Sequence, residues 1–139
     1  MTARGIRNNN PLNIRKSRDI FPGEVVPGTD KSFKQFETAA YGYRAAFVIL
    51  GSYLNRGLNT IEKIINAWAP ASENDTKSYI DRVEKGSFVR RDKVLTVNNG
   101  EDYVKIVLAM SLVENGVPAS PADVRTGFNM QRKLKSHLY

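Results

Sequence analysis

The stretch YVKIVLAMSLVENG, residues 103–116, decides the fold that this sequence predicts. Its interior, residues 104–113, has a single charged residue, Lys105, and its apolar side chains leave no clean polar face. A helix that is apolar nearly all round is a buried helix, and this one is too short and too interrupted to span a membrane. We therefore predict a buried central helix around which the rest of the chain packs.

Glu114 stands in the last turn of this predicted helix, just before Asn115 and Gly116, which form a typical helix stop. The helix dipole disfavours a carboxylate at this end, and burial raises the pKa of a carboxyl group. A glutamic acid with a raised pKa is suited to general acid catalysis. The alternative is that Glu114 points outward from a fraying last turn, and the residues alone leave both interpretations open.

The composition is that of a soluble globular protein with an excess of positive charge. Hydrophobic residues make up 41% of the 139 residues, which suits a real core, and we expect a single domain over residues 1–139. The formal net charge of +7 predicts attraction to an anionic partner, such as nucleic acid, lipid head groups or an anionic cell envelope. With no Cys and one His, the chain predicts no disulfide, no zinc-type metal site and no cofactor. No apolar run follows the first residues, so we expect no signal peptide and no transmembrane segment.

Apolar residues at helical spacing predict four further helices, over residues 38–56, 60–69, 76–85 and 120–135. With the central helix they make about five helices and a mainly α fold. Residues 1–30 show no helical or alternating period and are rich in Asn, Gly and Pro, which favour turns. We expect an irregular N-terminal lobe there, with a short strand pair near Val25 and Val26 as one interpretation.

The N-terminal lobe contains a cluster of asparagines, Asn8, Asn9, Asn10 and Asn13, within the stretch RGIRNNNPLNIR. An amide side chain has both donors and acceptors, so such a cluster can hold a loop in shape or bind the amide group of a sugar. Both interpretations stay open on the residues.

The stretch WAPASENDT, residues 68–76, connects two predicted helices and holds the only Trp of the chain. Its acids Glu73 and Asp75 precede a helix, and acids at a helix N-terminus have a structural role. The functional alternative is a Trp68 platform for a sugar ring beside an acid. A helix-turn-helix is a third interpretation of residues 60–85. The Pro-containing turn and the lack of stacking aromatics make that a poor match, so no specific nucleic-acid partner is expected.

These pieces together resemble a family of small phage and prophage proteins that are described as virion structural or lysozyme-like proteins. The resemblance covers nearly the whole chain and includes the opening RGIRNNNPLNIR, then Gly42-Tyr43-Arg44-Ala45, Trp68-Ala69-Pro70 and Glu114-Asn115-Gly116. It implies a location in the virion or in the bacterial periplasm or cell envelope, reached without a signal peptide of its own. It also implies contacts with other virion proteins, and the positive net charge favours contact with the anionic envelope.

A second resemblance, to cell-wall glucosaminidases and lytic transglycosylases, bears on mechanism. Residues 9–15, NNPLNIR, are similar to the Asn-Asn-Leu-Phe-Gly-Ile-Lys stretch of the glucosaminidases, and residues 112–116, LVENG, are similar to the Glu-Ser-Gly helix end of these enzymes. In the glucosaminidases the catalytic Glu precedes the Asn stretch, whereas Glu114 follows it here. The resemblance therefore implies a lysozyme-like domain that is circularly permuted, which would bring Glu114 beside the asparagines.

The function expected from these resemblances is cleavage of peptidoglycan glycan strands, by an enzyme of the muramidase, glucosaminidase or lytic transglycosylase type. Glu114 would be the general acid and Glu73 a reserve carboxylate. The implied contacts with the sugar are Asn8, Asn9, Asn10, Asn13, Trp68 and Tyr79. No second catalytic carboxylate stands out, which favours a transglycosylase or a substrate-assisted route. Two alternatives remain: a non-catalytic virion structural or glycan-binding protein, and a nucleic-acid-binding helical protein.

Overall fold

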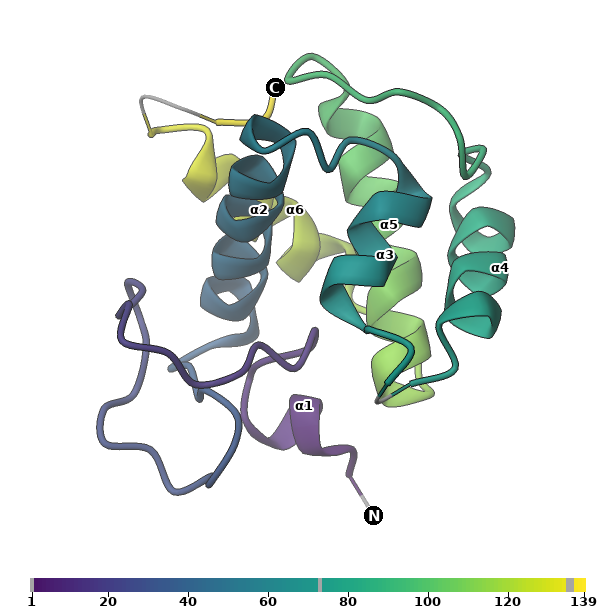
Figure 1. Ribbon diagram of the computed structural model, residues 1–139. Helices are drawn as coiled ribbons and strands as arrows, with labels where there is room; N and C mark the ends of the chain where they lie inside the picture. The colour runs from purple at the N-terminus through teal and green to yellow at the C-terminus, as the bar shows by residue number, and fades with distance from the viewer. Residues whose placement is uncertain (1, 73, 135–136) are drawn as a thin grey trace.

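A computed structural model describes residues 2–72, 74–134 and 137–139 and shows a mainly helical molecule, as the sequence predicts (Figure 1). Within these residues there are six helices: α1 (Arg4–Arg7), α2 (Ala39–Asn55), α3 (Ile61–Trp68), α4 (Thr76–Ser87), α5 (Gly100–Asn115) and α6 (Pro121–Gln131). The helix that the sequence did not predict is α1, because a single turn of four residues shows no apolar period. No helix in the described ranges is both long enough and apolar enough to cross a membrane.

Short polar side chains explain where most of the helices begin. Thr38, Thr60, Asp75 and Ser120 each accept a hydrogen bond from a backbone N–H of the following first turn, as N-cap residues do. The start of α5 differs, since its N-cap residue Asn99 uses its side chain to accept a hydrogen bond from Thr96 instead. This helix begins three residues earlier than the apolar run predicts, because the polar residues before that run join its first turn.

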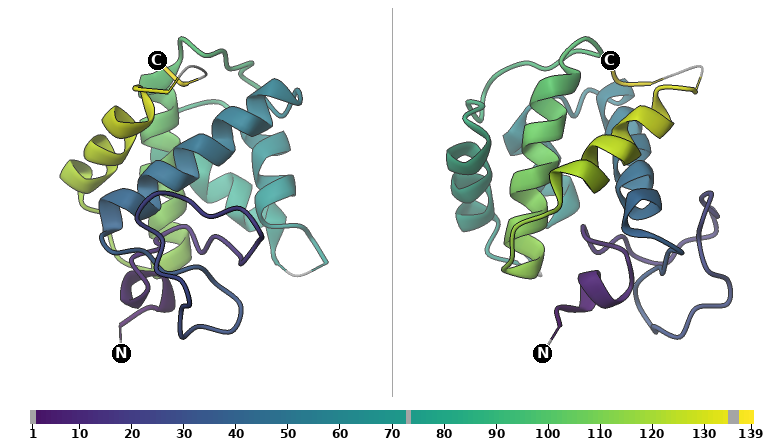
Figure 2. Two further views of the ribbon diagram at one scale, coloured as in Figure 1. Left: turned by 90° about the vertical axis from the view of Figure 1, so that its left-hand side faces the viewer. Right: turned by 180° about the vertical axis from the view of Figure 1, so that it is seen from behind.

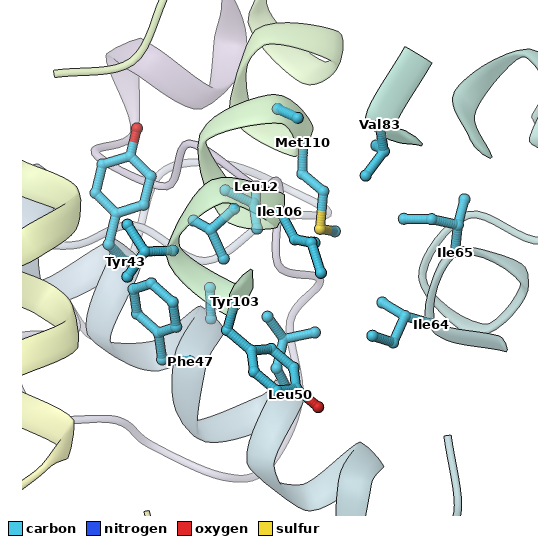
Figure 3. Close-up of a cluster of buried hydrophobic side chains, with 14 of the residues drawn as sticks. Leu12, Tyr43, Phe47, Leu50, Ile64, Ile65, Val83, Tyr103, Ile106 and Met110 are labelled. Carbon is cyan, nitrogen blue, oxygen red and sulfur yellow. The ribbon is translucent and has the colours of Figure 1, made fainter. Parts of the chain in front are cut away.

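The central position of α5 agrees with its sequence. Val107 and Met110 are fully buried in the hydrophobic core, and Figure 3 shows Met110 within this cluster. Leu108 is only partly buried, although an apolar run without a clean polar face predicts burial on every side. It shares a helix face with the exposed side chains of Lys105 and Leu112, so α5 keeps one side toward solvent.

Helices α2 and α6 pack closely against each other (Figures 1 and 2). Gly127 of α6 permits this approach, because a Cβ atom there would lie 2.7 Å from the backbone nitrogen of Arg44. The rings of Phe47 and Phe128 meet edge to face beside it, with their centroids 5.2 Å apart. α6 ends at Gln131, earlier than predicted, and the Gln131 side chain bonds to both the backbone N–H and the carbonyl of Leu138.

The irregular N-terminal lobe, expected over residues 1–30, extends over residues 8–37 in the structure. It lies beside the start of α2 and the end of α5 (Figures 1 and 2). In place of the strand pair considered near Val25 and Val26, which are both exposed, the described residues form only two isolated bridges. The lobe is held by the buried Lys34, whose Nζ donates to the carboxylate of Glu24 at 3.0 Å and to the carbonyl of Asp19 at 2.6 Å. These contacts fix the shape of a segment whose described residues form isolated β-bridges and no β-strands.

Candidate functional site

The side chain of Glu114, in the last turn of α5, points toward the N-terminal lobe and not outward. Nδ2 of Asn13 donates to its Oε1 at 2.7 Å, and the hydroxyl of Tyr79 donates to its Oε2 at 2.8 Å. Three segments far apart in the sequence therefore meet at one carboxyl group. The alternative of a fraying last turn with an exposed Glu114 is excluded.

Residues 8–15, which we call the asparagine loop, pack closely on the end of α5. This packing positions Asn13. Asn13 has a φ of 53°, in the left-handed region that Asn tolerates better than most residues. One residue beyond Glu114, Nδ2 of Asn115 donates to the carbonyl of Pro11 at 2.8 Å. Gly5 lies against the same place, since a Cβ atom there would be 2.6 Å from Oδ1 of Asn115. The packing of this loop against the Glu114 end of the helix, expected from the sequence, is thus present.

Burial is the largest of the effects on the pKa of Glu114. It raises the pKa of Glu114 above the ordinary glutamate value, against the hydrogen bonds from Asn13 and Tyr79 and the positive charge of Arg15, which lower it. Burial and the neighbouring Glu114 also raise the pKa of Tyr79 well above its ordinary value, so the Tyr79 hydroxyl keeps its proton. Glu114 is therefore a carboxyl group that retains a proton more readily than an exposed glutamate does.

The other three asparagines have internal roles. Asn10 is fully buried, and its amide bonds to both backbone groups of Ile14 and to the carbonyl of Lys34. Asn8 bonds to the side chains of Asp30 and Gln35, and Nδ2 of Asn9 donates to the carbonyls of Phe36 and Glu37. These amides tie the lobe together, so only Asn13 of the cluster reaches Glu114. The sequence could not separate them, because all four amides carry the same groups.

Trp68 lies at the end of α3 and lines a pocket of about 440 Å³, which we call the aromatic pocket. Its Nε1 donates to the carbonyl of Leu12 at 3.1 Å, and the ring of Tyr53 stands edge-on to it at 6.0 Å. The aromatic pocket is lined by Asn13, Ile14, Arg15, Ser17, Asp19, Phe21, Ile49, Tyr53, Ala67, Trp68 and Pro70. Trp68 is thus connected to Glu114 through the shared wall residue Asn13.

A second, smaller pocket of about 240 Å³ lies at Glu114 itself, and we call it the carboxyl pocket. It is lined by Asn74, Asp75, Ser78, Tyr79, Arg82, Val113 and Glu114. Asp75 caps α4 by accepting a hydrogen bond from the N–H of Ser78 at 3.1 Å, as the sequence predicts. The sequence interpretation missed Arg82, whose position three residues after Tyr79 on the same helix could have indicated it. Glu73, the reserve carboxylate, lies outside the described residues.

The arrangement places a carboxyl group in the wall of the carboxyl pocket, bonded to a residue that lines the aromatic pocket. A carboxyl group with a raised pKa is oriented by an amide on one oxygen and a hydroxyl on the other. A carboxyl group with a raised pKa can transfer a proton to a ligand atom within its reach.

No protein-family model matches the chain. Protein P5 of Pseudoalteromonas phage PM2 is 40% identical to it in a match of 131 residues that covers 91% of this chain and 80% of Protein P5. The similarity extends over most of both proteins.

Proposed function

The chain belongs to the family of Protein P5 of Pseudoalteromonas phage PM2. From the geometry around Glu114 we propose that it is a lysozyme-like protein that cleaves the glycan strands of peptidoglycan. The observation that supports the proposal best is the Glu114 carboxyl, which lines the carboxyl pocket and is held by Asn13 and Tyr79. A glutamate at the end of a buried helix, facing an irregular lobe, also resembles the site of lysozyme-like enzymes. In this chain the lobe comes first in the sequence, which fits a circular permutation.

In this proposal Glu114 is the general acid. It gives its proton to the glycosidic oxygen as the bond to the anomeric carbon breaks. Asn13 and Tyr79 hold the carboxyl in place, and Asn13 and Trp68 bind sugars on the side of the aromatic pocket. Asn8, Asn9 and Asn10 are left out of the substrate contacts, because their amides are used within the lobe.

The route proposed is that of a lytic transglycosylase or a substrate-assisted enzyme. Among the described residues that line the carboxyl pocket, the other carboxylate is Asp75, and it is engaged as the cap of α4. A two-carboxylate hydrolase needs its second carboxylate as a base or nucleophile close to the reacting carbon. The proposed location is the virion or the cell envelope, with peptidoglycan and other virion proteins as partners.

The test is clearance of a suspension of purified peptidoglycan, with soluble fragments measured. Glu114→Gln keeps the size of the side chain but removes the transferable proton, and we expect the rate to fall by about 10²–10⁴-fold. Glu37→Gln, a change at an exposed glutamate, is the matched control and should leave the rate unchanged. If Glu73→Gln abolishes clearance and Glu114→Gln does not, Glu73 and not Glu114 is the general acid.

A non-catalytic virion component that binds glycan is the second candidate. The observation in its favour is that both Glu114 oxygens already accept hydrogen bonds, so the carboxyl also fastens the asparagine loop to α5. Wild-type protein that sediments with peptidoglycan but releases no soluble fragments would support this candidate over the enzyme.

A further inference from the structure

We propose that the Asn13 side chain responds to the protonation of Glu114. Its amide donates a hydrogen bond to the carboxylate form, as in the structure, and rotates by half a turn to accept one from the protonated form. Asn115 supplies the acceptor to which the rotated amide donates. Asn13 and Asn115 are then positioning residues for the proposed acid. Their role in proton transfer rests on the proposed function, whereas the rotation of the amide does not.

Two buried amide oxygens support the inference. Oδ1 of Asn13 and Oδ1 of Asn115 are both shielded from solvent, and neither accepts a hydrogen bond from the residues that the structure describes. Buried polar atoms in proteins are nearly always paired, so two unpaired acceptors at one site call for a physical explanation.

The two oxygens lie on the same side of Gly5 in α1. A Cβ atom on Gly5 would be 2.6 Å from Oδ1 of Asn115 and 3.0 Å from Oδ1 of Asn13. Half a turn of the Asn13 amide exchanges its oxygen and its nitrogen. The Nδ2 donor would then take the place of Oδ1 and face the unpaired acceptor of Asn115.

Asn13 can rotate in this way, whereas the amide of Asn115 is fixed. Nδ2 of Asn115 donates to the carbonyl of Pro11 at 2.8 Å and to the carbonyl of Ser111 at 2.9 Å, which holds its oxygen in place. The side chain of Asn13 is bonded to Glu114, and its backbone N–H donates to the carbonyl of Asn10 at 2.9 Å. The backbone hydrogen bond keeps the loop in position while the side chain turns.

Protonation of Glu114 changes which orientation of Asn13 satisfies these groups. In the carboxylate form, Oε1 accepts from Asn13 and Oε2 accepts from the Tyr79 hydroxyl. A proton on Oε1 would set two donors against each other in the present orientation. After half a turn, the Oε1 hydroxyl donates to Oδ1 of Asn13 and Nδ2 donates to Oδ1 of Asn115. Both unpaired oxygens then have a donor, and Tyr79 keeps its hydrogen bond.

Tyr79 offers the alternative place for the proton. Its hydroxyl could accept from a proton on Oε2, but it would then give up its own donation to Glu114. The other charged groups around Glu114 are Asp75 and Arg82 of α4, which line the carboxyl pocket, and Arg15, whose charge favours the carboxylate. Asp75 is engaged as the cap of α4. The rotation of Asn13 therefore keeps more of the hydrogen bonds than the alternative does.

In the proposed reaction, the Asn13 amide would stabilise both states of the acid. Before proton transfer it accepts a hydrogen bond from the protonated carboxyl group. After transfer it rotates back and donates to the carboxylate, which is the arrangement in the structure. A fixed donor at this position would favour only the carboxylate.

Solution NMR of the isotope-labelled, full-length protein tests the rotation. The side-chain amide protons of Asn13 and the carboxyl carbon of Glu114 are followed from about pH 8 to about pH 4, a range in which a carboxyl group with a raised pKa titrates. We expect the nuclear Overhauser effect between the Asn13 amide protons and the α protons of Gly5 to strengthen severalfold, with the same midpoint as Glu114. Asn10 is the internal control, because its amide is bonded on both sides and should not respond.

The Glu114→Gln variant is the matched neutral form, since its amide can donate as the protonated acid does. The strong contact between Asn13 and Gly5 should be present in it at every pH. In Tyr79→Phe the contact should still respond to pH, with its midpoint moved to higher pH.

Three results would overturn the inference. An Asn13 signal that stays constant while Glu114 titrates would place the proton on Oε2, beside Tyr79. A strong contact with Gly5 at every pH in the wild type, or a weak one in Glu114→Gln, would show that the amide does not follow the charge of Glu114. Fragment release tests the proposed function separately: if Asn13 rotates but no fragments are released, the rotation stands and the enzyme proposal is wrong.

Discussion

Opposing effects act on the carboxyl group of Glu114. Burial is the largest and raises its pKa, while the Asn13 amide, the Tyr79 hydroxyl and the positive charge of Arg15 lower it. Two hydrogen bonds to the charged form would, without burial, hold a carboxylate ionised at neutral pH. The pKa of Glu114 therefore depends on the balance between burial and these three neighbours. The contribution of each neighbour can be removed by a separate substitution.

Tyr79→Phe removes one of these neighbours and keeps the ring. Because the Tyr79 hydrogen bond lowers the pKa of Glu114, its loss should raise that pKa further. A general acid stops working as the pH rises through its pKa. The alkaline limb of the pH–rate profile for fragment release should therefore move to higher pH in this variant.

The profile is measured between about pH 4 and about pH 9, a range that covers both the ordinary and the raised pKa of a carboxyl group. Tyr41→Phe, which removes a hydroxyl from a residue outside both pockets, should leave the limb in place. A limb that does not move in Tyr79→Phe, or that moves to lower pH, would show that Glu114 is not the acid that limits the reaction.

At the scale of elements, the site depends on a close approach between α1 and the end of α5. Gly5 makes this possible, because a Cβ atom there would lie 2.6 Å from Oδ1 of Asn115 and 2.8 Å from the carbonyl oxygen of Asn10. Both of these oxygens are part of the packing that places Asn13 beside Glu114. A short turn that no periodicity predicts is thus a direct support of the site.

Gly5→Ala should lower the free energy of unfolding by about 1–3 kcal/mol, the usual effect of an extra methyl group in a tightly packed place. Gly51→Ala is the matched control, since nothing lies within 4 Å of its Cβ position and it sits inside α2. There the added methyl should stabilise the protein by about 0.5–1 kcal/mol through helix propensity. Urea unfolding measures both, and equal effects of the two changes would contradict the close packing.

The elements also show what the sequence could and could not predict. Apolar spacing and cap residues such as Thr38 and Ser120 placed five of the helices to within a few residues. They could not predict α1, nor which asparagine turns toward Glu114, because that choice depends on the fold of the whole lobe. Glu114 could be proposed because the end of a buried helix can be recognised locally, and Arg82 could have been proposed from its spacing to Tyr79. The aromatic pocket could not, because it arises only when separate segments meet.

At the scale of the whole molecule, the irregular lobe is held together by buried polar contacts. Lys34 is almost fully buried, which its sequence neighbours do not suggest, and its ammonium group lies 3.0 Å from the carboxylate of Glu24. The same ammonium group donates a hydrogen bond to the carbonyl of Asp19, a residue that lines the aromatic pocket. The wall of the pocket that contains Phe21 and Asp19 therefore depends on one ion pair.

Lys34→Met keeps the length of the side chain but leaves the Glu24 carboxylate buried without its charged partner. Breaking a buried pair in this way typically costs about 3–5 kcal/mol, so the free energy of unfolding should fall by about that much. Replacing both partners, as Lys34→Met with Glu24→Leu, should recover most of the loss, because neither charge is then left unpaired. Lys31→Met, at an exposed lysine of the same lobe, should change stability little. Urea unfolding of the wild type and these three variants measures the differences in free energy of unfolding. If the double variant is no more stable than Lys34→Met alone, the ion pair is not what holds the lobe against the site.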